Sequence, residues 1–154
     1  MRAPYNVLVL PHCSRENEDF YCIFQRRDML KWQFVAGGGE NQEKPFEAAI
    51  RELSEETGIQ NCKVEEMTSK TFVPVFHFSE ESRAAWGGSV IVIPVYCFSA
   101  EIDPTENIVL SEEHTQYRWV DYKTAVDMLH FDIDKTAIWE LNTKLKKKID
   151  ENYF

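Results

Sequence analysis

Three glutamates near the end of a predicted helix are the first residues of this sequence that could do chemistry. Glu52, Glu55 and Glu56 fall within the last two turns of that helix. Carboxylates at this end lie near the negative pole of the helix dipole and repel one another. Each should therefore destabilise the helix by about a few tenths of a kcal/mol. A helical wheel places all three on one arc beside the buried stripe. Such a set of oxygens suits a hard dication, Mg²⁺ or Mn²⁺, whose charge would offset the repulsion.

The helix that carries these glutamates has recognisable ends. The segment Pro45–Thr57 begins with proline, which fits the first helical position, and Gly58 fits the residue past the last turn. Residues 37–43 are predicted to form a loop before it, because their three glycines let the backbone adopt positive φ or approach a ligand closely. Carbonyl groups of this loop can face the carboxylates, which strengthens the prediction of an oxygen-lined cation site.

Alternating and apolar segments predict a mixed sheet around this helix. The run at residues 89–98 is almost entirely apolar, as expected of a central strand, and Pro94 within it predicts a bulge or a side without a strand partner. Residues 79–88 are predicted to form a polar loop. The other strands are predicted at residues 5–10, 19–25, 32–36, 63–78 and 114–120, and the other helices at 123–129 and 136–149. This order predicts an α/β sandwich with a mixed sheet.

Composition limits the kinds of partner that this chain can have. A length of 154 residues fits a single domain over residues 1–154, and a net charge of −9 argues against binding nucleic acid or an anionic membrane. No apolar run reaches the length of about 18 residues that a membrane span needs. The start of the chain lacks a small-residue cleavage site, so a cytoplasmic protein is expected. Four scattered cysteines without a CxxC pair argue against zinc and against a disulfide framework.

Residues 37–59 are identified as a Nudix box, the signature of the Nudix hydrolase family. The order of strands and helices around the box also resembles this family over nearly the whole chain. The resemblance implies a Nudix-type α/β/α sandwich and metal-dependent hydrolysis of a phosphoanhydride bond. The matching positions of the box are Gly37, Glu43, Arg51, Glu52, Leu53, Glu55, Glu56, Gly58 and Ile59.

The resemblance implies a role for each main residue of the box. Glu52, Glu55 and Glu56 are the expected ligands of Mg²⁺ or Mn²⁺, and one of them could act as the general base. The carbonyl oxygen of Gly37 is expected to add a ligand. Arg51 is expected to take part in catalysis by orienting a box glutamate.

Residues outside the box complete the predicted site. Several Nudix proteins take a ligand or base from a loop beyond the box, so Glu113 is expected to be both, with Glu112 as the substitute. Arg26 and Arg27 could grip substrate phosphates as bidentate donors, or instead cap a strand or pair with surface acids. Trp86 could stack on a base or pterin ring, or instead lie buried at an edge of the fold.

The segment LSEEHTQYRWVD, at residues 110–121, limits the range of predicted substrates. It resembles two Nudix branches, the dihydroneopterin triphosphate and dNTP pyrophosphatases and the asymmetric diadenosine tetraphosphate hydrolases. Trp32 and Gln33 resemble the first branch more closely, whereas Val35 and Ala36 stand where many relatives have Pro and Gly.

These resemblances predict an enzyme that acts on a small nucleotide or pterin polyphosphate. It would cleave a (deoxy)nucleoside or dihydroneopterin triphosphate to a monophosphate and pyrophosphate. The alternative is a diadenosine tetraphosphate hydrolase, and the second alternative is a nucleotide-binding module without turnover. Whether the chain forms a homodimer is left open.

Overall fold

The computed structural model describes the backbone of residues 1–153 and the side chains of residues 1–148. The strands are β1 (Arg2–Arg15), β2 (Glu18–Arg26), β3 (Trp32–Gln33), β4 (Val35–Glu40), β5 (Lys63–Pro74), β6 (Val92–Glu101) and β7 (His114–Val120). The helices are α1 (Pro45–Thr57), α2 (Glu80–Trp86), α3 (Tyr122–Met128) and α4 (Asp132–Tyr153), with a 3₁₀ turn, η1, at Val75–His77. Within the described chain, no helix combines the length and the apolar character that a membrane span requires.

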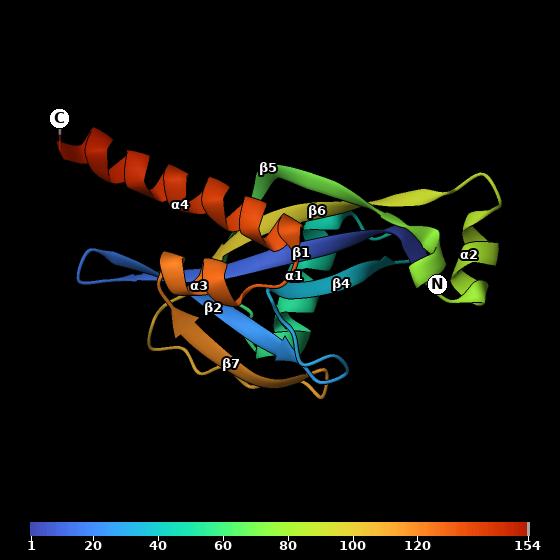
Figure 1. Ribbon diagram of the computed structural model, residues 1–154, viewed down its shortest axis with the longest axis horizontal. Coiled ribbons are helices and arrows are strands. Elements are labelled where there is room, and N and C mark those ends of the chain that lie inside the picture. The colour runs from blue at the N-terminus through green and yellow to red at the C-terminus, as the bar shows by residue number, and fades with distance from the viewer. Residues whose placement is uncertain (154) are drawn as a thin grey trace.

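Strand β1 is the centre of the sheet because it pairs along both of its edges. On one edge it runs parallel to β6. On the other edge its first half pairs antiparallel with β4 and its second half pairs antiparallel with β2. The sheet has the order β3-β2-β1-β6-β5, with β4 joined to β1 and β7 joined to β2 (Figure 1). The prediction of a mixed sheet is therefore confirmed.

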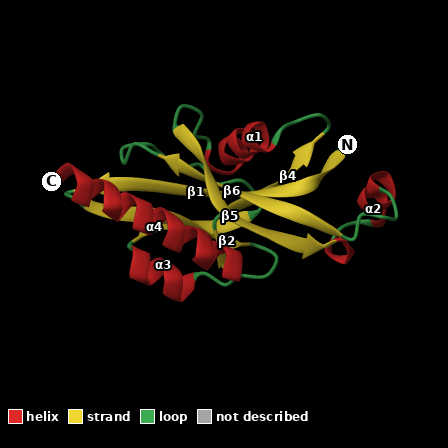
Figure 2. Ribbon diagram, turned by 90° about the horizontal axis from the view of Figure 1, so that it is seen from above, coloured by secondary structure: helices red, strands yellow, loops and turns green. Residues whose placement is uncertain are grey.

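Helices cover both faces of this sheet (Figure 2). Helix α1 packs on one face, and helices α3 and α4 pack on the other. The apolar run of β1 serves both cores, since Val7 and Val9 belong to the α1 side and Leu8 and Leu10 to the α4 side. Successive side chains of a strand point to opposite faces, which explains why this run shows no polar alternation. The predicted α/β sandwich is confirmed.

Strands β1 and β2, where the sequence predicts strands at residues 5–10 and 19–25, pair antiparallel as a hairpin. Its turn is shorter than the polar segment at residues 14–18. Strands β1 and β2 continue into the polar segment, and only Glu16 and Asn17 lie between them. Both residues have positive φ, of 51° and 67°. Two successive positive φ values give a turn whose twist matches that of the flanking strands.

The glycine segment before α1 is a strand, where the sequence predicted a loop. Gly37 and Gly38 belong to β4 and pair with β1. Among the described glycines, positive φ occurs at Gly58 and Gly87 and not in this segment. Close contacts explain the glycines instead: a Cβ on Gly37 would overlap the carboxyl group of Glu52, and a Cβ on Gly38 would overlap the guanidinium of Arg2.

Helix α1 has the predicted bounds. At its start the backbone N–H of Lys44 donates to the carboxylate of Glu47 at 3.0 Å. At its end Gly58 has a φ of 77°, and its N–H donates to the carbonyl oxygen of Ser54 at 2.8 Å. The left-handed conformation at this position favours glycine, as the sequence predicted.

The end of β5, η1, α2 and the start of β6 form a projecting arm, which we define as residues 70–95 (Figure 1). Residues 79–88, predicted to be a loop, contain α2, which Ser79 caps by accepting a hydrogen bond from the N–H of Ser82 at 3.1 Å. Pro94 pairs with Phe72 of β5 and lies beyond the part of β6 that pairs with β1. Pro94 thus lacks a strand partner on one side, which is one of the two predicted alternatives. Large apolar side chains exposed on the arm are Phe72, Phe76, Ile91 and Val92.

Helix α4 is attached to the sheet through an acidic side chain. The carboxylate of Glu140 accepts hydrogen bonds from the N–H groups of Thr68, at 2.9 Å, and Ser69, at 2.7 Å. These groups lie where the register between β5 and β6 shifts, so Glu140 satisfies donors that the irregular ladder leaves free. Burial opposes ionisation of Glu140, but these bonds and Lys144 outweigh it and lower its pKa to about 2.

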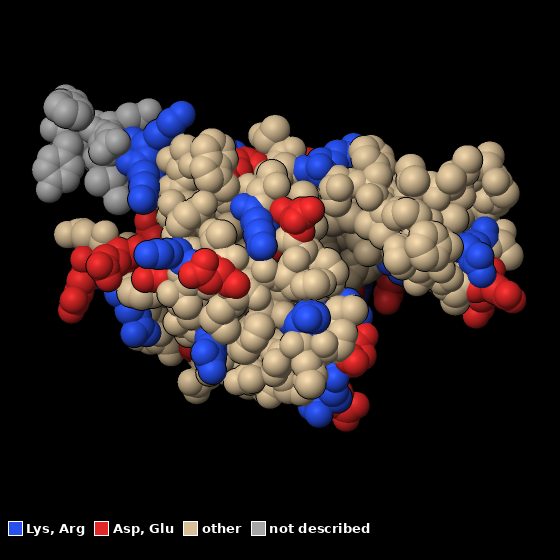
Figure 3. All heavy atoms as spheres, in the orientation of Figure 1, with Lys and Arg blue, Asp and Glu red and all other residues tan. Residues whose placement is uncertain are grey.

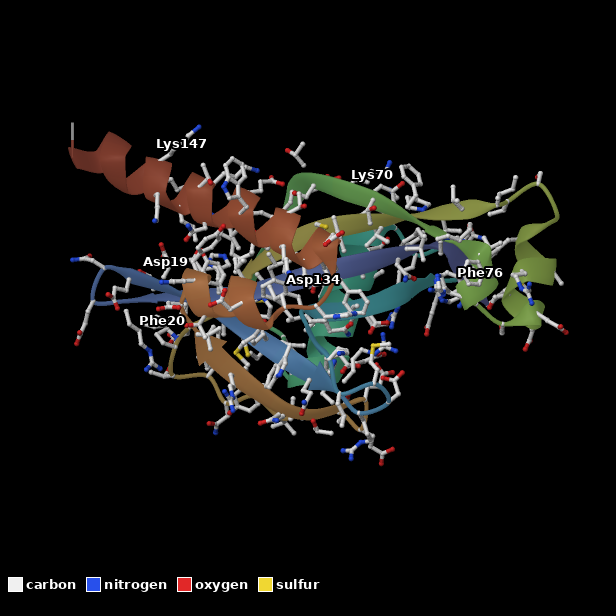
Figure 4. The ribbon with its side chains drawn as sticks, viewed as in Figure 1. Asp19, Phe20, Lys70, Phe76, Asp134 and Lys147 are labelled. Atoms are coloured by element: carbon white, nitrogen blue, oxygen red, sulfur yellow. The ribbon has the colours of Figure 1, made fainter. Side chains whose placement is uncertain are left out.

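Asp134 fixes the start of α4 over the middle of the molecule (Figure 4). Its carboxylate accepts a hydrogen bond from the N–H of Phe34 at 2.8 Å, which joins α4 to the segment between β3 and β4. The side chain is almost fully buried. Burial raises the pKa of Asp134 to about 7, although the bond from Phe34 favours the charged form.

This raised pKa predicts a pH dependence of stability. The folded chain holds the Asp134 proton more tightly than the unfolded chain, whose pKa is near 3.8. The stabilisation is complete below that pKa and is lost as the pH rises through about 7, so the free energy of unfolding should fall over this range. Asp134→Asn keeps an acceptor for Phe34 without titrating, and urea unfolding at pH 5 and pH 8 should show a smaller difference than in the wild type. The exposed Asp132→Asn is the control, and an equal pH dependence in Asp134→Asn and wild type would contradict the prediction.

Candidate functional site

Arg51 is the central side chain of the glutamate helix. Its Nε donates to Glu43 Oε2 at 2.8 Å, and its Nη2 donates to the carbonyl oxygen of Gly38 at 2.7 Å. Its Nη1 donates to Glu52 Oε1 at 3.1 Å and to Glu55 Oε2 at 3.2 Å. The hydrogen bond with Glu43 raises the pKa of Arg51, so the guanidinium stays charged. Arg51 thus ties α1 to β4 and orients two of the predicted ligands.

The three box glutamates have different environments. The side chains of Glu52 and Glu56 are 12% and 3% exposed, whereas that of Glu55 is 55% exposed. Burial raises the pKa of Glu52 to about 7, although the charge of Arg51 opposes the shift. The Glu52 carboxyl group lies over Gly37, in the space that a Cβ there would fill. Glu52 is therefore a buried carboxylate whose negative charge is only partly compensated.

Glu56 connects α1 to the loop before β7. Its Oε2 accepts a hydrogen bond from Ser111 Oγ at 2.6 Å, and Nδ1 of His114 lies 2.7 Å away in a direction unsuited to a hydrogen bond. Burial raises the pKa of Glu56, but His114 and Ser111 outweigh burial and lower it. Burial and the nearby charge of Glu56 raise the pKa of Glu113. Two neighbouring carboxyl groups are therefore shifted in opposite directions.

A cavity of about 1080 Å³ opens beside Glu113. Gly37, Glu113 and His114 line it, whereas Glu52, Glu55 and Glu56 are not among its lining residues. Glu52 lies against Gly37, and Glu56 lies against His114, so these two glutamates stand one residue behind the cavity wall. Its apolar lining includes Leu8, Val73, Phe78, Val95, Phe131 and Ile133, and its polar lining includes Arg2, Asn6, Gln33 and Asp134. The cavity thus offers an apolar interior next to a set of oxygen donors.

The two predicted arginines line this cavity. Arg26 is paired with Asp28, with its Nη2 2.6 Å and its Nε 3.0 Å from the carboxylate oxygens. The Nε of Arg27 donates to the carbonyl oxygen of Glu112 at 2.8 Å. The backbone N–H of Arg27 donates to the carbonyl oxygen of Glu113 at 2.9 Å. Arg27 therefore joins β2 to the loop that carries Glu113. Arg26 makes the ion pair that was one of its two expected roles.

Trp86 stands behind the wall of the cavity. Its indole Nε1 donates to the carbonyl oxygen of Arg2 at 2.7 Å, and its ring packs edge-on against Phe78. The described residues that line the cavity include Arg2 and Phe78 but not Trp86.

The donor set fits a divalent cation, although it is not a preformed cage. Among the described residues, no three His, Cys, Asp or Glu side chains are gathered into a cation site, because neighbouring side chains engage the glutamates. The carboxylates of Glu52, Glu56 and Glu113 and the carbonyl of Gly37 are the hard oxygen donors that Mg²⁺ and Mn²⁺ prefer. Arg51 compensates the buried charge of Glu52 only in part, so a dication there would relieve it.

Some residues of this site could not be identified from the sequence. Ser111 precedes Glu112 and Glu113 in the sequence, and this position alone could have indicated that it belongs to the site. Arg2 and Asp134 lie far apart in the sequence. The pairing of β1 with β4 and the packing of α4 on the sheet bring both to the cavity.

Comparison with known proteins supports the fold and the box. A family model described as NUDIX domain matches residues 4–139. The solved structure of a Listeria monocytogenes protein described as a NUDIX hydrolase is 37% identical, with a TM-score of 0.85, over 95% of this chain and 97% of that chain. The Escherichia coli dihydroneopterin triphosphate pyrophosphohydrolase is 23% identical, with a TM-score of 0.72, over 92% of this chain and 97% of that chain, and shares the fold.

Curated relatives cover less of this protein. An RNA pyrophosphohydrolase from Bartonella tribocorum is 29% identical over 106 residues, which are 61% of this chain and 58% of the relative. The chain spans between 22% and 58% of the length of four curated relatives that it matches.

The donor set predicts stabilisation by divalent cations. Added MgCl₂ should raise the melting temperature, because an ion that binds only the folded chain stabilises it by about 2.7 kcal/mol at a hundred times its Kd. Glu52→Gln and Glu56→Gln should each reduce the shift measured by differential scanning fluorimetry. Glu106→Gln, which alters an exposed acid in the loop after β6, should leave the shift unchanged. A full shift in both box variants would contradict the predicted site.

Proposed function

Because the chain belongs to the NUDIX domain family, we propose that it is a metal-dependent pyrophosphohydrolase that cleaves a (deoxy)nucleoside or dihydroneopterin triphosphate to a monophosphate and pyrophosphate. One observation carries the proposal: Gly37, which underlies Glu52, and Glu113, which lies beside Glu56, both line the large cavity. A substrate seated there can bring its phosphates to the carboxylates.

The residues of this chain hold the reacting groups in place. A divalent cation, when bound by Glu52, Glu55, Glu56, Glu113 and the Gly37 carbonyl, would neutralise phosphate charge and acidify water. Arg51 holds Glu52 and Glu55 through one guanidinium. Ser111 holds Glu56 through a hydrogen bond, and His114 lies against its carboxylate. Because these groups are positioned before the substrate arrives, little reorganisation is needed during the reaction.

Two carboxylates are suited to take a proton from the attacking water. The pKa of Glu52 is raised to about 7, and that of Glu113 is also raised, in both cases chiefly by burial. Because a base works best when its pKa lies near the working pH, the one of these two that a bound cation leaves unligated would be the better base. Glu55 remains a third candidate because it belongs to the Nudix box and is the most exposed of the three box glutamates. As the base takes the proton, the water oxygen bonds to phosphorus, the anhydride P–O bond breaks, and pyrophosphate leaves.

The lining of the cavity supports a substrate that carries a flat ring. Phe131 and Ile133 provide apolar surface, and the buried side chains of Gln33 and Asp134 provide hydrogen-bonding groups beside it. Pockets that combine a mostly apolar wall with a few polar groups typically bind small organic ligands. On the face shown in Figure 3, basic and acidic side chains are interspersed, without the continuous basic surface that long nucleic acids need.

The size of the cavity favours a second candidate substrate. Its volume of about 1080 Å³ lies just above the range of about 300–1,000 Å³ that is usual for small-molecule pockets. A dinucleoside polyphosphate, such as diadenosine tetraphosphate, could place its second nucleoside there.

A substrate panel tests the proposal. With Mg²⁺ present, the products from nucleoside triphosphates, dihydroneopterin triphosphate, diadenosine tetraphosphate and 5′-triphosphorylated RNA are separated by anion-exchange chromatography. We expect the highest kcat/KM with a nucleoside or pterin triphosphate. A higher value with diadenosine tetraphosphate would favour the second candidate. Absence of turnover with every compound, with Mg²⁺ or with Mn²⁺, would overturn the proposal in favour of a nucleotide-binding module.

Single substitutions test the carboxylates on the best substrate. Glu56→Gln keeps the shape of the side chain and removes its charge, so kcat should fall by about a hundredfold or more while circular dichroism stays unchanged. Glu55→Gln should also lower kcat by orders of magnitude. Glu66→Gln changes an exposed acid of β5 and should keep wild-type kcat. Full turnover by either box variant would remove that residue from the proposed mechanism.

A further inference from the structure

We propose that Arg2 is a phosphate-binding residue of the cavity and that Phe78 and Trp86 position it. The inference rests on the proposed function, since it names a cation that would hold the phosphates of its substrate. Arg2 stands at the start of β1, is partly buried and lines the cavity.

The guanidinium of Arg2 has two unused donors. Its Nη1 donates to the carbonyl oxygens of Ala3, at 2.7 Å, and Tyr5, at 2.8 Å, and its Nη2 donates to Asn6 Oδ1. Since a guanidinium has five N–H donors, Nε–H and one Nη2–H have no acceptor among the described residues. The Nε–H lies on the edge that Nε shares with Nη2, and this is an edge at which a guanidinium can bind a phosphate bidentately.

Two other arginines of the site show what this edge does when it is occupied. Arg26 uses Nε and Nη2 to bind both carboxylate oxygens of Asp28. Arg51 uses the same two atoms to bind both carboxylate oxygens of Glu43. Arg2 has no such carboxylate among the described residues, so its Nε–H and its second Nη2–H are available to an anion that enters the cavity.

Two aromatic rings of the arm hold the guanidinium. Its Cζ lies 5.4 Å from the ring centroid of Phe78 and 5.7 Å from that of Trp86, distances at which the ring faces attract a cation. The two rings pack edge-on with centroids 5.4 Å apart. The indole N–H of Trp86 also donates to the carbonyl oxygen of Arg2. Trp86 therefore touches both the backbone and the charged group of Arg2, and it acts on the substrate through Arg2.

The chain around Arg2 leaves its side chain little freedom. The guanidinium occupies the space that a Cβ on Gly38 would fill. The carbonyl oxygen of the preceding residue, Met1, accepts a hydrogen bond from the N–H of Asn41 at 2.7 Å. Burial lowers the pKa of Arg2, although the charge of Glu52 opposes the shift. A partly desolvated, fixed cation of this kind gains more from an incoming anion than an exposed one does.

Binding of inorganic tripolyphosphate tests the proposal without metal or turnover. Isothermal titration calorimetry in EDTA should show a Kd about tenfold weaker, or more, in Arg2→Met than in the wild type, and an intermediate Kd in Arg2→Lys, which restores the charge but not the bidentate edge. Arg15→Met, an exposed arginine at the other end of β1, should match the wild type. An unchanged Kd in Arg2→Met, or no measurable binding to the wild type, would overturn the proposal. If Arg2→Met fails to fold, a wild-type Kd in Arg2→Lys would overturn the proposal instead.

A double-mutant cycle tests the role of Trp86. If Trp86 acts through Arg2, Trp86→Leu weakens tripolyphosphate binding on its own but adds nothing in the Arg2→Met background. Trp86→Phe, which keeps a ring over the guanidinium but loses the N–H bond, should lie between wild type and Trp86→Leu. Additive losses in the double variant would overturn the positioning role, since they would mean that Trp86 meets the ligand directly.

Kinetics separate this proposal from the proposed function. On any substrate that is hydrolysed, Arg2→Met should raise KM about tenfold with kcat within about twofold, because the contact exists in both the ground and the transition state. A lowered kcat with an unchanged KM would overturn the binding role. If no substrate is hydrolysed while the tripolyphosphate Kd still depends on Arg2, the proposed function fails and the anion site stands.

Discussion

The hydrogen bonds of Arg51 are the interaction on which the arrangement of the box depends. One guanidinium joins the helix that carries the glutamates to the strand that carries the glycines, through Glu43 and the Gly38 carbonyl. The same group holds Glu52 and Glu55. Removing it would leave several carboxylates close together with little compensating charge, which is costly inside a protein. Its position in the middle of α1 therefore determines both the geometry of the site and its electrostatic balance.

Strand β4 places two opposite charges on its two faces. Because successive residues of a strand face opposite sides, Gly37 receives the Glu52 carboxyl group from the α1 side, and Gly38 receives the Arg2 guanidinium from the other. Without side chains of its own at these positions, the strand lets both groups approach its backbone. An anionic and a cationic group are thus separated by little more than one layer of backbone, at the edge of one cavity.

Local signals in the sequence were sufficient for part of this structure. Proline, glycine and the stripe of apolar residues predicted α1, and the continuous apolar runs predicted strands buried on both faces. The glycine segment was predicted as a loop, because the reason for its glycines is contact with Glu52 and Arg2, which lie far away in the sequence. The same holds for Asp134, whose place at the cavity follows from the packing of α4.

The arm at residues 70–95 has a consequence for how this protein can diverge. The predicted metal ligands lie on β4, on α1 and in the loop before β7, whereas Phe78 and Trp86 lie on the arm. Substitutions, insertions or deletions in the arm can therefore change which molecules are retained in the cavity while the hydrolytic groups keep their positions. The arm is the segment to randomise in a directed-evolution library for new substrates, and natural lineages could change their substrate range by drift in the same stretch.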